Sequence, residues 1–317
     1  MSLAPTDSRV GLARGGSPLR RSLLDLAYLG AWGTLVSCAG APPAPPAPFR
    51  VPLWAESAPV SDGSTERSSV EAEAYLPARG SETGAAIVLC PGGGYIRHVM
   101  DREGYPLSRW LADHGIAVLL LPYRLPEGRP FVPLYDAQRA LRLVRARASE
   151  WRIDPARVGI LGLSAGGHVA STAGTHFDQG RPGQADPVER QSSRPDFMVL
   201  VYPVVTMGEK TNAPSKAKLL GPHPTPEQVR LFSNETQVTR ETPPAFLAHA
   251  KDDTSVPPEN SRDLVAALKA HQVPVEYLEF PTGGHGFNGC KGPIWEEWKA
   301  RSLDWMRSRG ILPPGSP

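Results

Sequence analysis

Residues 158–168 have the sequence VGILGLSAGGH, and this stretch decides the fold of the 317-residue chain. It opens with a short apolar run, as a strand buried on both faces requires. A helix is predicted to begin near Ala165, so GLSAG at 162–166 forms the turn between strand and helix. In so tight a turn, side chains at the two glycine positions would collide with neighbouring backbone. The stretch therefore predicts a G-x-S-x-G nucleophile elbow with Ser164 at its tip, although the motif alone also fits an ordinary strand-to-helix turn.

The remainder of the chain repeats this alternation of short apolar runs with segments of helical period. Such alternation predicts an α/β fold with a mostly parallel central sheet and helices on both faces. In the segment 134–149, Leu134, Leu141 and Val144 share one face and the arginines lie elsewhere. The predicted strands are Ala85–Cys90, Ala117–Pro122, Val158–Gly162, Phe197–Tyr202, Ala245–Ala250 and Val275–Phe280, and the further helices are Glu103–His114, Leu134–Ser149, Glu259–Ala270 and Trp295–Ser308.

The segments outside these elements differ in what they predict. Residues 51–77 are expected to add one or two edge strands, which are antiparallel in many sheets of this kind. The polar stretches 175–196 and 206–244 are long for connections within a compact domain. Long loops at the C-terminal edge of a parallel sheet commonly carry function, and we expect these two to do so.

Two later strand ends offer partners for Ser164. An acid and then a histidine must follow the serine in the chain, each after a later strand. The sequence KDDTSVP at 251–257 follows one predicted strand, and GGHGF at 283–287 follows the next. His285 is therefore the predicted base, while either Asp252 or Asp253 could be the acid, since the other carboxylate could cap the turn. We expect His168 and His249 to be core or supporting groups.

The sequence PGGGY at 91–95 predicts a site for a developing oxyanion. It follows the predicted strand that ends at Cys90, in the place where many esterases carry HGGG. Residues without a Cβ allow backbone N–H groups to converge, and we expect Gly93 and Gly94 to donate together with Ala165. The alternative is a hairpin turn built of three glycines.

Composition and cysteine count exclude several classes of protein. Lys and Arg number 34 against 32 Asp and Glu, giving a net charge of +2 without a basic block, so nucleic acid is not an expected partner. The three cysteines, Cys38, Cys90 and Cys290, are too few for a disulfide scaffold and lack the spacing of a zinc site. We therefore expect no metal.

The N-terminal segment has the features of an export signal. Arg20 and Arg21 precede an apolar run, residues 26–36, that is too short for a permanent membrane span. LVSC at 35–38 resembles the bacterial lipobox, which implies lipidation of Cys38 and anchoring to the cell envelope facing the periplasm. The prediction is a signal at 1–38, a Pro/Ala-rich tether at 39–50 and one hydrolase domain at 51–314. A buried N-terminal helix is the alternative.

Together these motifs resemble the α/β-hydrolase superfamily, and more closely the bacterial acetyl xylan esterase-like hydrolases with a PGGGY oxyanion loop. In that superfamily the acid usually lies three residues before a Val-Pro pair, which implies Asp253. The resemblance implies an α/β-hydrolase fold, a Ser164, His285 and Asp253 triad, and deacetylation of xylan or xylo-oligosaccharides without a cofactor. It covers residue 52 to the C-terminus and also rests on PYRL at 122–125, DP at 154–155, SAGGH at 164–168, RPDF at 194–197 and VP at 256–257.

Other functions stay open at this level. A generalist carboxylesterase would carry the same triad, and so would a small prolyl-oligopeptidase-like peptidase, although the latter normally carries a propeller or helical cap. A hydrolase-fold binding protein would have lost a triad member, which this sequence has not. Aromatic residues at Tyr95, Tyr123 and Phe287 are expected to frame the site and to suit a sugar ester, unless they merely pack the loops.

Overall fold

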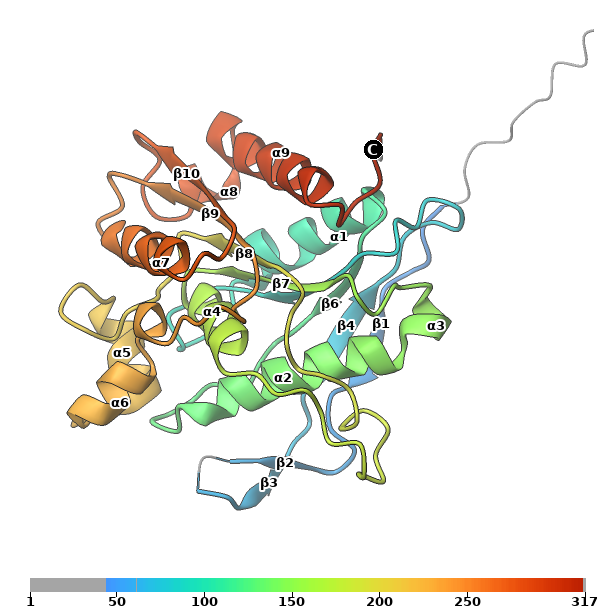
Figure 1. Ribbon diagram of the computed structural model, residues 1–317, viewed down its shortest axis with the longest axis horizontal. Coiled ribbons are helices and arrows are strands. Elements are labelled where there is room, and N and C mark those ends of the chain that lie inside the picture. Colours follow the sequence, from blue (N-terminus) through green and yellow to red (C-terminus); the bar gives the residue numbers. More distant parts are fainter. Residues whose placement is uncertain (1–43, 61, 316–317) are drawn as a thin grey trace, which may run out of the picture. The chain divides into compact units, whose positions relative to one another are not determined.

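The structure, a computed structural model, describes residues 44–60 and 62–315. Its central element is an eight-stranded sheet in the order β1-β4-β6-β5-β7-β8-β9-β10 (Figure 1). Neighbouring strands from β6 to β10 are parallel, whereas the pairs β1 with β4 and β4 with β6 are antiparallel. The strands are β1 (Phe49–Pro52), β4 (Glu71–Tyr75), β5 (Ala86–Cys90), β6 (Ala117–Leu120), β7 (Val158–Leu163), β8 (Met198–Val201), β9 (Ala245–Ala250) and β10 (Val275–Phe280).

The predicted fold class is confirmed, because all six predicted strands pair in this sheet and helices cover both of its faces. Leu141 of α2, Val169 of α4 and Leu264 of α7 belong to one buried cluster, and Leu111 of α1 and Trp305 of α9 belong to the cluster on the other face. These helices are α1 (Tyr105–Asp113), α2 (Phe131–Ala146), α4 (Ala165–Thr175), α7 (Glu259–Ala270) and α9 (Pro293–Ser308), with short α3 (Ala148–Trp151) and α8 (Phe287–Cys290) beside them.

The N-terminal part of this domain differs from the expectation in two ways. Phe49 and Arg50, assigned to the tether, are the first residues of β1. Besides the two antiparallel edge strands, residues 51–77 form a separate hairpin of β2 (Ser57–Pro59) and β3 (Thr65–Arg67). The predicted signal and lipidation site at Cys38 lie outside the described residues. In the described ranges, no helix has both the length and the apolar character to cross a membrane.

The sequence pattern predicted a long loop at residues 206–244. The structure instead has short helices there. They are α5 (Ala213–Leu220), α6 (Pro226–Leu231) and the 3₁₀ turn η2 (Asn234–Thr236). The Asn212 side chain accepts the Ser215 N–H at the start of α5, and Thr225 forms a capping box with Gln228 at the start of α6. These helices are too short for hydrophobic periodicity to predict them. Their capping residues, Asn212 and Thr225, are the signal in the sequence that indicates where they begin.

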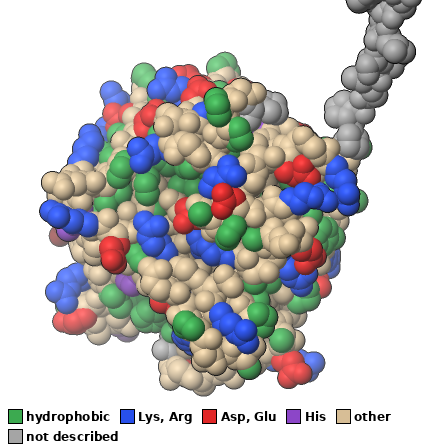
Figure 2. Space-filling view, turned by 45° about the vertical axis from the view of Figure 1, so that its right-hand side comes forward, with side chains coloured by type: hydrophobic (Ala, Val, Ile, Leu, Met, Phe, Trp, Pro, Cys, Tyr) green, Lys and Arg blue, Asp and Glu red, His purple; other side chains and the backbone are tan. Residues whose placement is uncertain are grey.

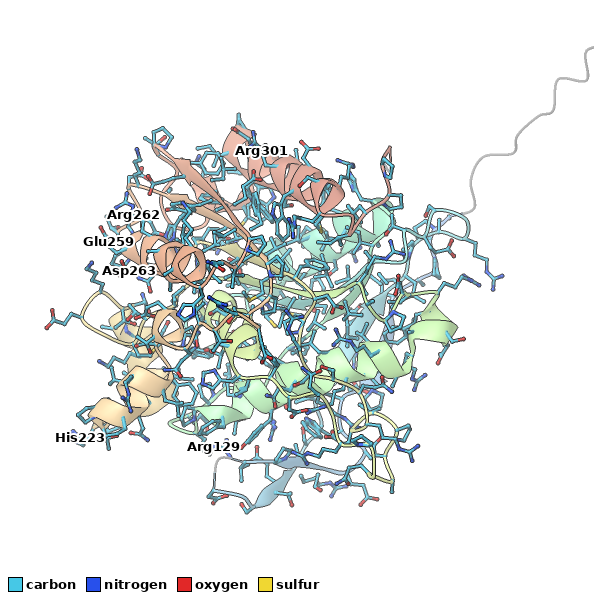
Figure 3. All side chains as sticks on the ribbon, viewed as in Figure 1. Arg129, His223, Glu259, Arg262, Asp263 and Arg301 are labelled. Atoms are coloured by element: carbon cyan, nitrogen blue, oxygen red, sulfur yellow. The ribbon has the colours of Figure 1, made fainter. Side chains whose placement is uncertain are left out.

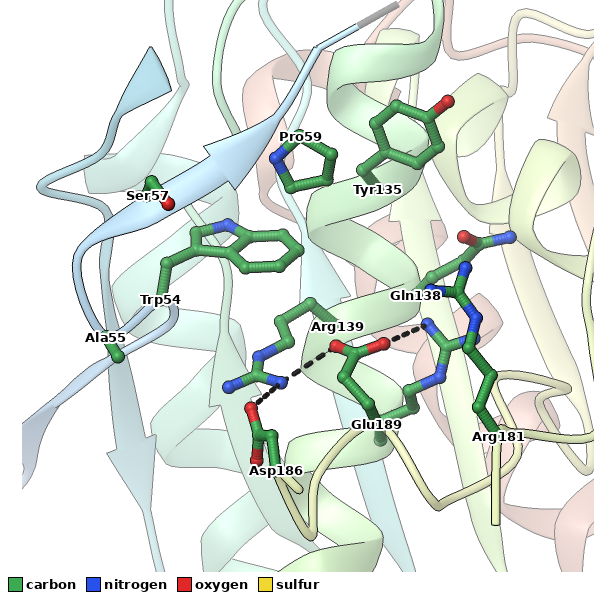
Figure 4. Close-up of a pocket in the computed structure, with 11 residues that line it drawn as sticks. Trp54, Ala55, Ser57, Pro59, Tyr135, Gln138, Arg139, Arg181, Asp186 and Glu189 are labelled. Carbon is green, nitrogen blue, oxygen red and sulfur yellow. Dashed lines mark hydrogen bonds and ion pairs between the residues drawn. The ribbon is translucent and has the colours of Figure 1, made fainter. Parts of the chain in front are cut away.

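The other long stretch, 175–196, lies at the opposite edge from the one expected. It follows α4 and precedes β8, so it joins the two at the N-terminal edge of the sheet. There it covers the arginines of α2, which are buried rather than exposed to solvent. Figure 4 shows Asp186 and Glu189 of this stretch beside Arg139. Their ion pairs are Arg139 with Asp186 and Glu189, Arg142 with Asp178, and Arg145 with Asp196. The prediction that this stretch serves the site is therefore wrong.

Charges elsewhere on the surface are mixed in sign. On the face shown in Figure 2, basic and acidic side chains are interspersed rather than gathered into one field. On α7, Arg262 pairs with Glu259 one turn away and with Glu279 of β10, with all three side chains partly exposed (Figure 3). Such exposed pairs contribute little to stability.

Candidate active site

Ser164 occupies a strained turn between β7 and α4. Its φ of 53° and ψ of −121° are unfavourable for a residue with a side chain. The flanking glycines make the turn possible: a Cβ at Gly162 would lie 2.1 Å from the Gly166 carbonyl oxygen. A Cβ at Gly166 would lie 2.1 Å from the carbonyl oxygen of Cys90. The fold thus holds a serine at the C-terminal end of the central strand.

The structure brings Asp253 and His285 to this serine. Asp253 follows β9 and His285 follows β10, so both arrive at the C-terminal edge of the sheet. His285 Nε2 lies 2.9 Å from Ser164 Oγ, and His285 Nδ1 lies 2.7 Å from Asp253 Oδ2. Serine, imidazole and carboxylate are therefore connected in the order that nucleophilic catalysis by serine needs.

The environment of Asp253 favours its charged form. Its Oδ1 accepts the N–H groups of Ser255 and Val256, both at 2.9 Å. Burial alone would raise the pKa of this carboxyl, but hydrogen bonds with His249 and His285 and the charge of His285 outweigh it and hold the pKa well below its usual range. Asp253 can thus keep a negative charge beside the imidazole.

The neighbouring Asp252 has a different task. Its Oδ1 accepts the Gly284 N–H at 2.8 Å, and its Oδ2 accepts the Gly283 N–H at 3.2 Å. This carboxylate therefore caps the turn that carries His285, while Asp253 contacts the imidazole itself. The sequence left the two aspartates open until the family resemblance was used, and the geometry assigns them separate partners.

His249 shares the carboxylate of Asp253. Its Nε2 lies 3.2 Å from Asp253 Oδ2 and 3.1 Å from the Val256 carbonyl oxygen, and its Nδ1 lies 2.7 Å from Ser261 Oγ. The side chain is fully buried in β9. His249 thus contacts Asp253 Oδ2, the same oxygen that contacts His285, a contact that its position four residues before Asp253 did not by itself identify.

The PGGGY loop follows β5 and lies beside Ser164. Gly93 has a φ of 133°, and a Cβ there would lie 2.0 Å from the Arg97 carbonyl oxygen, so glycine is required. The Gly93 carbonyl accepts the Ile96 N–H at 3.1 Å, closing the turn. Within the described ranges, no acceptor takes the N–H groups of Gly93 and Gly94. Ala165 is the first residue of α4, where N–H groups lack intrahelical partners. Among the described residues, the N–H groups of Gly93 and Gly94 are therefore free beside the serine, and Ala165 is fully buried at the start of α4.

Gly93, Gly94, Ser164 and His285 line a cavity of about 310 Å³, whereas Ala165 does not. Its lining combines polar or charged side chains with glycines and a few less polar residues: Gly93, Gly94, Val99, Arg102, Glu103, Ser164, Asn212, Pro214, Ser215, Ser255, His285, Gly286, Gly289 and Cys290. Cys90 and Cys290 are both free thiols. No group of His, Cys, Asp and Glu in residues 44–60 and 62–315 could hold a metal ion.

The aromatic residues expected to frame the cavity do not do so. Tyr95 is 2% exposed, and Tyr123 and Phe287 are fully buried. The Tyr95 hydroxyl lies 2.7 Å from Nδ1 of His168, whose Nε2 lies 2.8 Å from the Phe232 carbonyl oxygen, and burial lowers the pKa of His168 to about 4. His168 is thus a neutral core group, as expected, and the tyrosines pack the loops.

An elbow serine joined to a histidine and an aspartate on a mostly parallel sheet defines the α/β-hydrolase class. The chain belongs to the BD-FAE family, whose model matches residues 73–268. An acetyl ester-xyloside bifunctional hydrolase from Caldicellulosiruptor lactoaceticus is 40% identical, with a TM-score of 0.76 over 83% of this chain and 97% of that one.

Two further relatives extend this similarity to longer proteins. An acetylxylan esterase of Xylanibacter ruminicola is 36% identical over 218 residues, which are 67% of this chain and 42% of the relative. Endo-1,4-beta-xylanase B of Butyrivibrio fibrisolvens is 35% identical over 216 residues, which are 67% of this chain and 34% of the relative. The chain thus spans less than half the length of these two proteins. The predicted resemblance to acetyl xylan esterase-like α/β-hydrolases is confirmed.

Proposed function

We propose that this protein is a serine esterase that removes acetyl groups from xylan or xylo-oligosaccharides through an acyl-enzyme intermediate. The observation that carries the proposal is the hydrogen-bonded series from Asp253 through His285 to Ser164, next to a glycine loop with unengaged N–H groups. Ester hydrolysis through serine needs a nucleophile, a base, a group that orients the base and donors for the oxyanion. Candidates for all four lie at the C-terminal edge of the sheet, which supports the proposal.

In the acylation step, Ser164 Oγ attacks the ester carbonyl carbon while His285 Nε2 takes its proton. The carbonyl oxygen becomes an oxyanion that accepts hydrogen bonds from Gly93, Gly94 and Ala165. Asp253 holds the Nδ1–H of His285 and stabilises the imidazolium that forms. When the tetrahedral intermediate collapses, the bond to the sugar oxygen breaks, and His285 returns the proton to that oxygen. The alcohol leaves, and Ser164 remains acetylated.

The second step regenerates the serine. Water attacks the acetyl carbonyl and gives its proton to His285, and the oxyanion again forms at the same donors. Collapse of this intermediate expels Ser164 Oγ, which recovers the proton from His285 as acetate leaves. No redox change takes place in either step: the proton of Ser164 ends on the sugar alcohol, and a proton from water restores the serine.

Two observations support a short acyl group on a carbohydrate. The relatives at 35–40% identity are named for acetyl ester, xyloside or xylan chemistry. The cavity lining offers Asn212, Ser215, Ser255 and Arg102 rather than the continuous apolar surface that a long acyl chain would need. These polar side chains, rather than an aromatic frame, are the physical argument for a sugar ester.

The cellular context is a separate proposal that rests on the sequence of the N-terminal segment. We propose export to the cell envelope with a lipid on Cys38, which would place the hydrolase domain near a membrane surface. Mass spectrometry of the protein purified from its native host tests this. A diacylated N-terminal Cys38 is the expected result, and an intact Met1 would contradict it.

The substrate proposal is tested with nitrophenyl esters of increasing chain length, followed by acetate release from acetylated xylo-oligosaccharides. We expect kcat/KM to be greatest for acetate, to fall by butyrate and octanoate, and acetate to be released from the oligosaccharides. A steady rise in kcat/KM towards octanoate, or no acetate release, would replace the carbohydrate acetylesterase with a generalist or lipid esterase.

A further inference from the structure

Glu103 is a buried acid in the catalytic cavity that the proposed reaction does not use. It lies in η1 (Met100–Gly104), the π-helical turn before α1, and is 6% exposed. It lines the same cavity as Ser164 and His285. A carboxyl group so close to a nucleophile is costly to bury unless its oxygens accept hydrogen bonds, so its partners define its role.

One oxygen of Glu103 holds the glycine loop. Its Oε2 accepts the Gly92 N–H at 2.6 Å, and Gly92 immediately precedes the proposed oxyanion donors Gly93 and Gly94. A Cβ added to Gly92 would lie 2.8 Å from Glu103 Oε2 and 2.9 Å from Ser164 Cβ. The carboxyl group and the nucleophile thus pack against the same glycine, which leaves neither room to shift alone.

The other oxygen of Glu103 reaches the base through Tyr202. Its Oε1 accepts the Tyr202 hydroxyl at 3.1 Å. The fully buried Tyr202 ring meets the His285 ring edge to face, with centroids 4.9 Å apart at 62°. A single carboxyl group therefore connects the loop that binds the oxyanion to the ring that supports the imidazole.

We propose that Glu103 is a positioning residue that holds the oxyanion loop and His285 in register about Ser164. The inference deepens the proposed esterase function and rests on it. Burial raises the pKa of Glu103, while hydrogen bonds from Gly92 and Tyr202 and the charges of His285 and Arg102 oppose that rise. Two donors and two acceptor oxygens match one to one, so the side chain acts through hydrogen bonds and not through volume alone.

Two substitutions of similar size separate these contributions. Glu103→Gln keeps an oxygen for the Gly92 N–H and an amide group that donates to the Tyr202 hydroxyl, whereas Glu103→Met fills the space without hydrogen bonds. We expect Glu103→Met to lower kcat for nitrophenyl acetate by about 100-fold, the order that misplacing an oxyanion donor costs, with KM changed less than threefold. Glu103→Gln should restore kcat to within about tenfold of the wild type.

A matched control is Glu235→Met. Glu235 is a half-buried glutamate whose pKa is likewise raised by burial, but it does not line the catalytic cavity. This variant should keep the wild-type kcat. If Glu103→Met fails to fold, Tyr202→Phe removes the hydroxyl that donates to Oε1 and also lies 3.8 Å from Cys290 Sγ. It should lower kcat by about tenfold, because the loop contact remains, and an unchanged kcat would overturn the link through Tyr202.

The outcomes separate this inference from the function on which it rests. A wild-type protein that cleaves no ester and fails to react with a fluorophosphonate would refute the esterase proposal. An active wild type with unchanged kcat in a folded Glu103→Met variant would overturn only the positioning role. Equal losses in Glu103→Met and Glu103→Gln, or a loss that appears as raised KM, would also overturn it.

Discussion

Two clusters of charged and polar side chains lie at opposite edges of the sheet. They contain similar residue types but have different roles. At the N-terminal edge, Arg139 and Arg142 are buried, and carboxylates of the 175–196 segment pair with them (Figure 4). At the C-terminal edge, Asp253 is buried and paired with two imidazoles, one of which continues to Ser164. In the first cluster the charged groups pair with one another, whereas the second cluster includes the proposed nucleophile, Ser164.

The difference shows what makes a polar cluster a site. The cavity beside the arginines has about 390 Å³ and contains Trp54 and Tyr135, so size and aromatic character alone would favour it. Its Arg139 and Arg142 guanidinium groups are already engaged by carboxylates and carbonyls, and Trp54 donates to Asp136. The catalytic cavity instead leaves N–H groups unengaged beside a strained serine. Substitutions in the two clusters should therefore affect different quantities.

The largest effect is expected for Ser164→Ala. Removing the nucleophile should lower kcat for nitrophenyl acetate by about 10⁶-fold, because the base and the oxyanion donors lose the group on which they act. Steady-state kinetics with pure protein measures this, with circular dichroism to confirm that the fold is intact. A decrease of less than tenfold in folded protein would exclude Ser164 as the nucleophile.

The next effect separates the paired aspartates. Asp253→Asn should lower kcat by about 10⁴-fold, because an amide neither fixes the same imidazole tautomer nor stabilises the imidazolium. Asp252→Asn should cost far less, since one side-chain oxygen still accepts an N–H of the turn at 283–284. Kinetics of both variants at matched stability is the measurement, and the reverse ranking would move the acid to Asp252.

In the arginine cluster the expected change is in stability and not in rate. Asp178→Asn removes the nearer of the two carboxylates that pair with Arg142, whose side chain is 4% exposed, while Glu189 remains 3.8 Å away. We expect the free energy of unfolding to fall by about 1 kcal/mol, because a buried guanidinium loses its nearer charged acceptor, and kcat to stay unchanged. Denaturant unfolding measures this. The matched control is Glu259→Gln in the exposed pair on α7, which should change stability by less than about 0.5 kcal/mol (Figure 3). A lower kcat in folded Asp178→Asn would contradict the conclusion that the arginine cluster affects only stability.

The smallest effect is a local response of this cluster to acid. Burial would raise the pKa of Asp178, but its hydrogen bonds with Arg142 and Gly180 and the charge of Arg142 lower it below its usual range. The folded pKa lies below the unfolded one, so the stabilisation is complete above about pH 4 and is lost as the pH falls through the folded value. The hydrogen-exchange protection factors of residues 178–193 should fall only below about pH 4. A fall in these protection factors between pH 7 and 5 would contradict the assignment.

The sequence predicts the catalytic cluster better than it predicts the arginine cluster. Ser164 and His285 follow apolar runs that predict strands, and the C-terminal ends of parallel strands meet at one edge, so their proximity was predictable. The segment 175–196 follows a helix and precedes a strand, which places it at the other edge. Its polar composition suggested a functional loop, while the order of elements already contradicted that expectation.

Other contacts were beyond sequence patterns. Glu103 and Gly92 meet because a π-helical turn folds back over the glycine loop, and no spacing rule relates a buried acid to a backbone N–H eleven residues earlier. Burial of the α2 arginines also depends on tertiary carboxylates that periodicity does not show. The roles of the two aspartates were also not predictable from spacing. Only the turn geometry shows that Asp252 accepts the Gly284 N–H and that Asp253 contacts His285.

Identification of the nucleophile tests the central claim most directly. The full chain is incubated with a fluorophosphonate, digested and examined by mass spectrometry, with Ser164→Ala treated in parallel. The account predicts one covalent adduct per molecule on the peptide that contains Ser164, loss of esterase activity in proportion to labelling, and no adduct in the variant. An active protein that is labelled at another residue, or that stays unlabelled, would contradict the account.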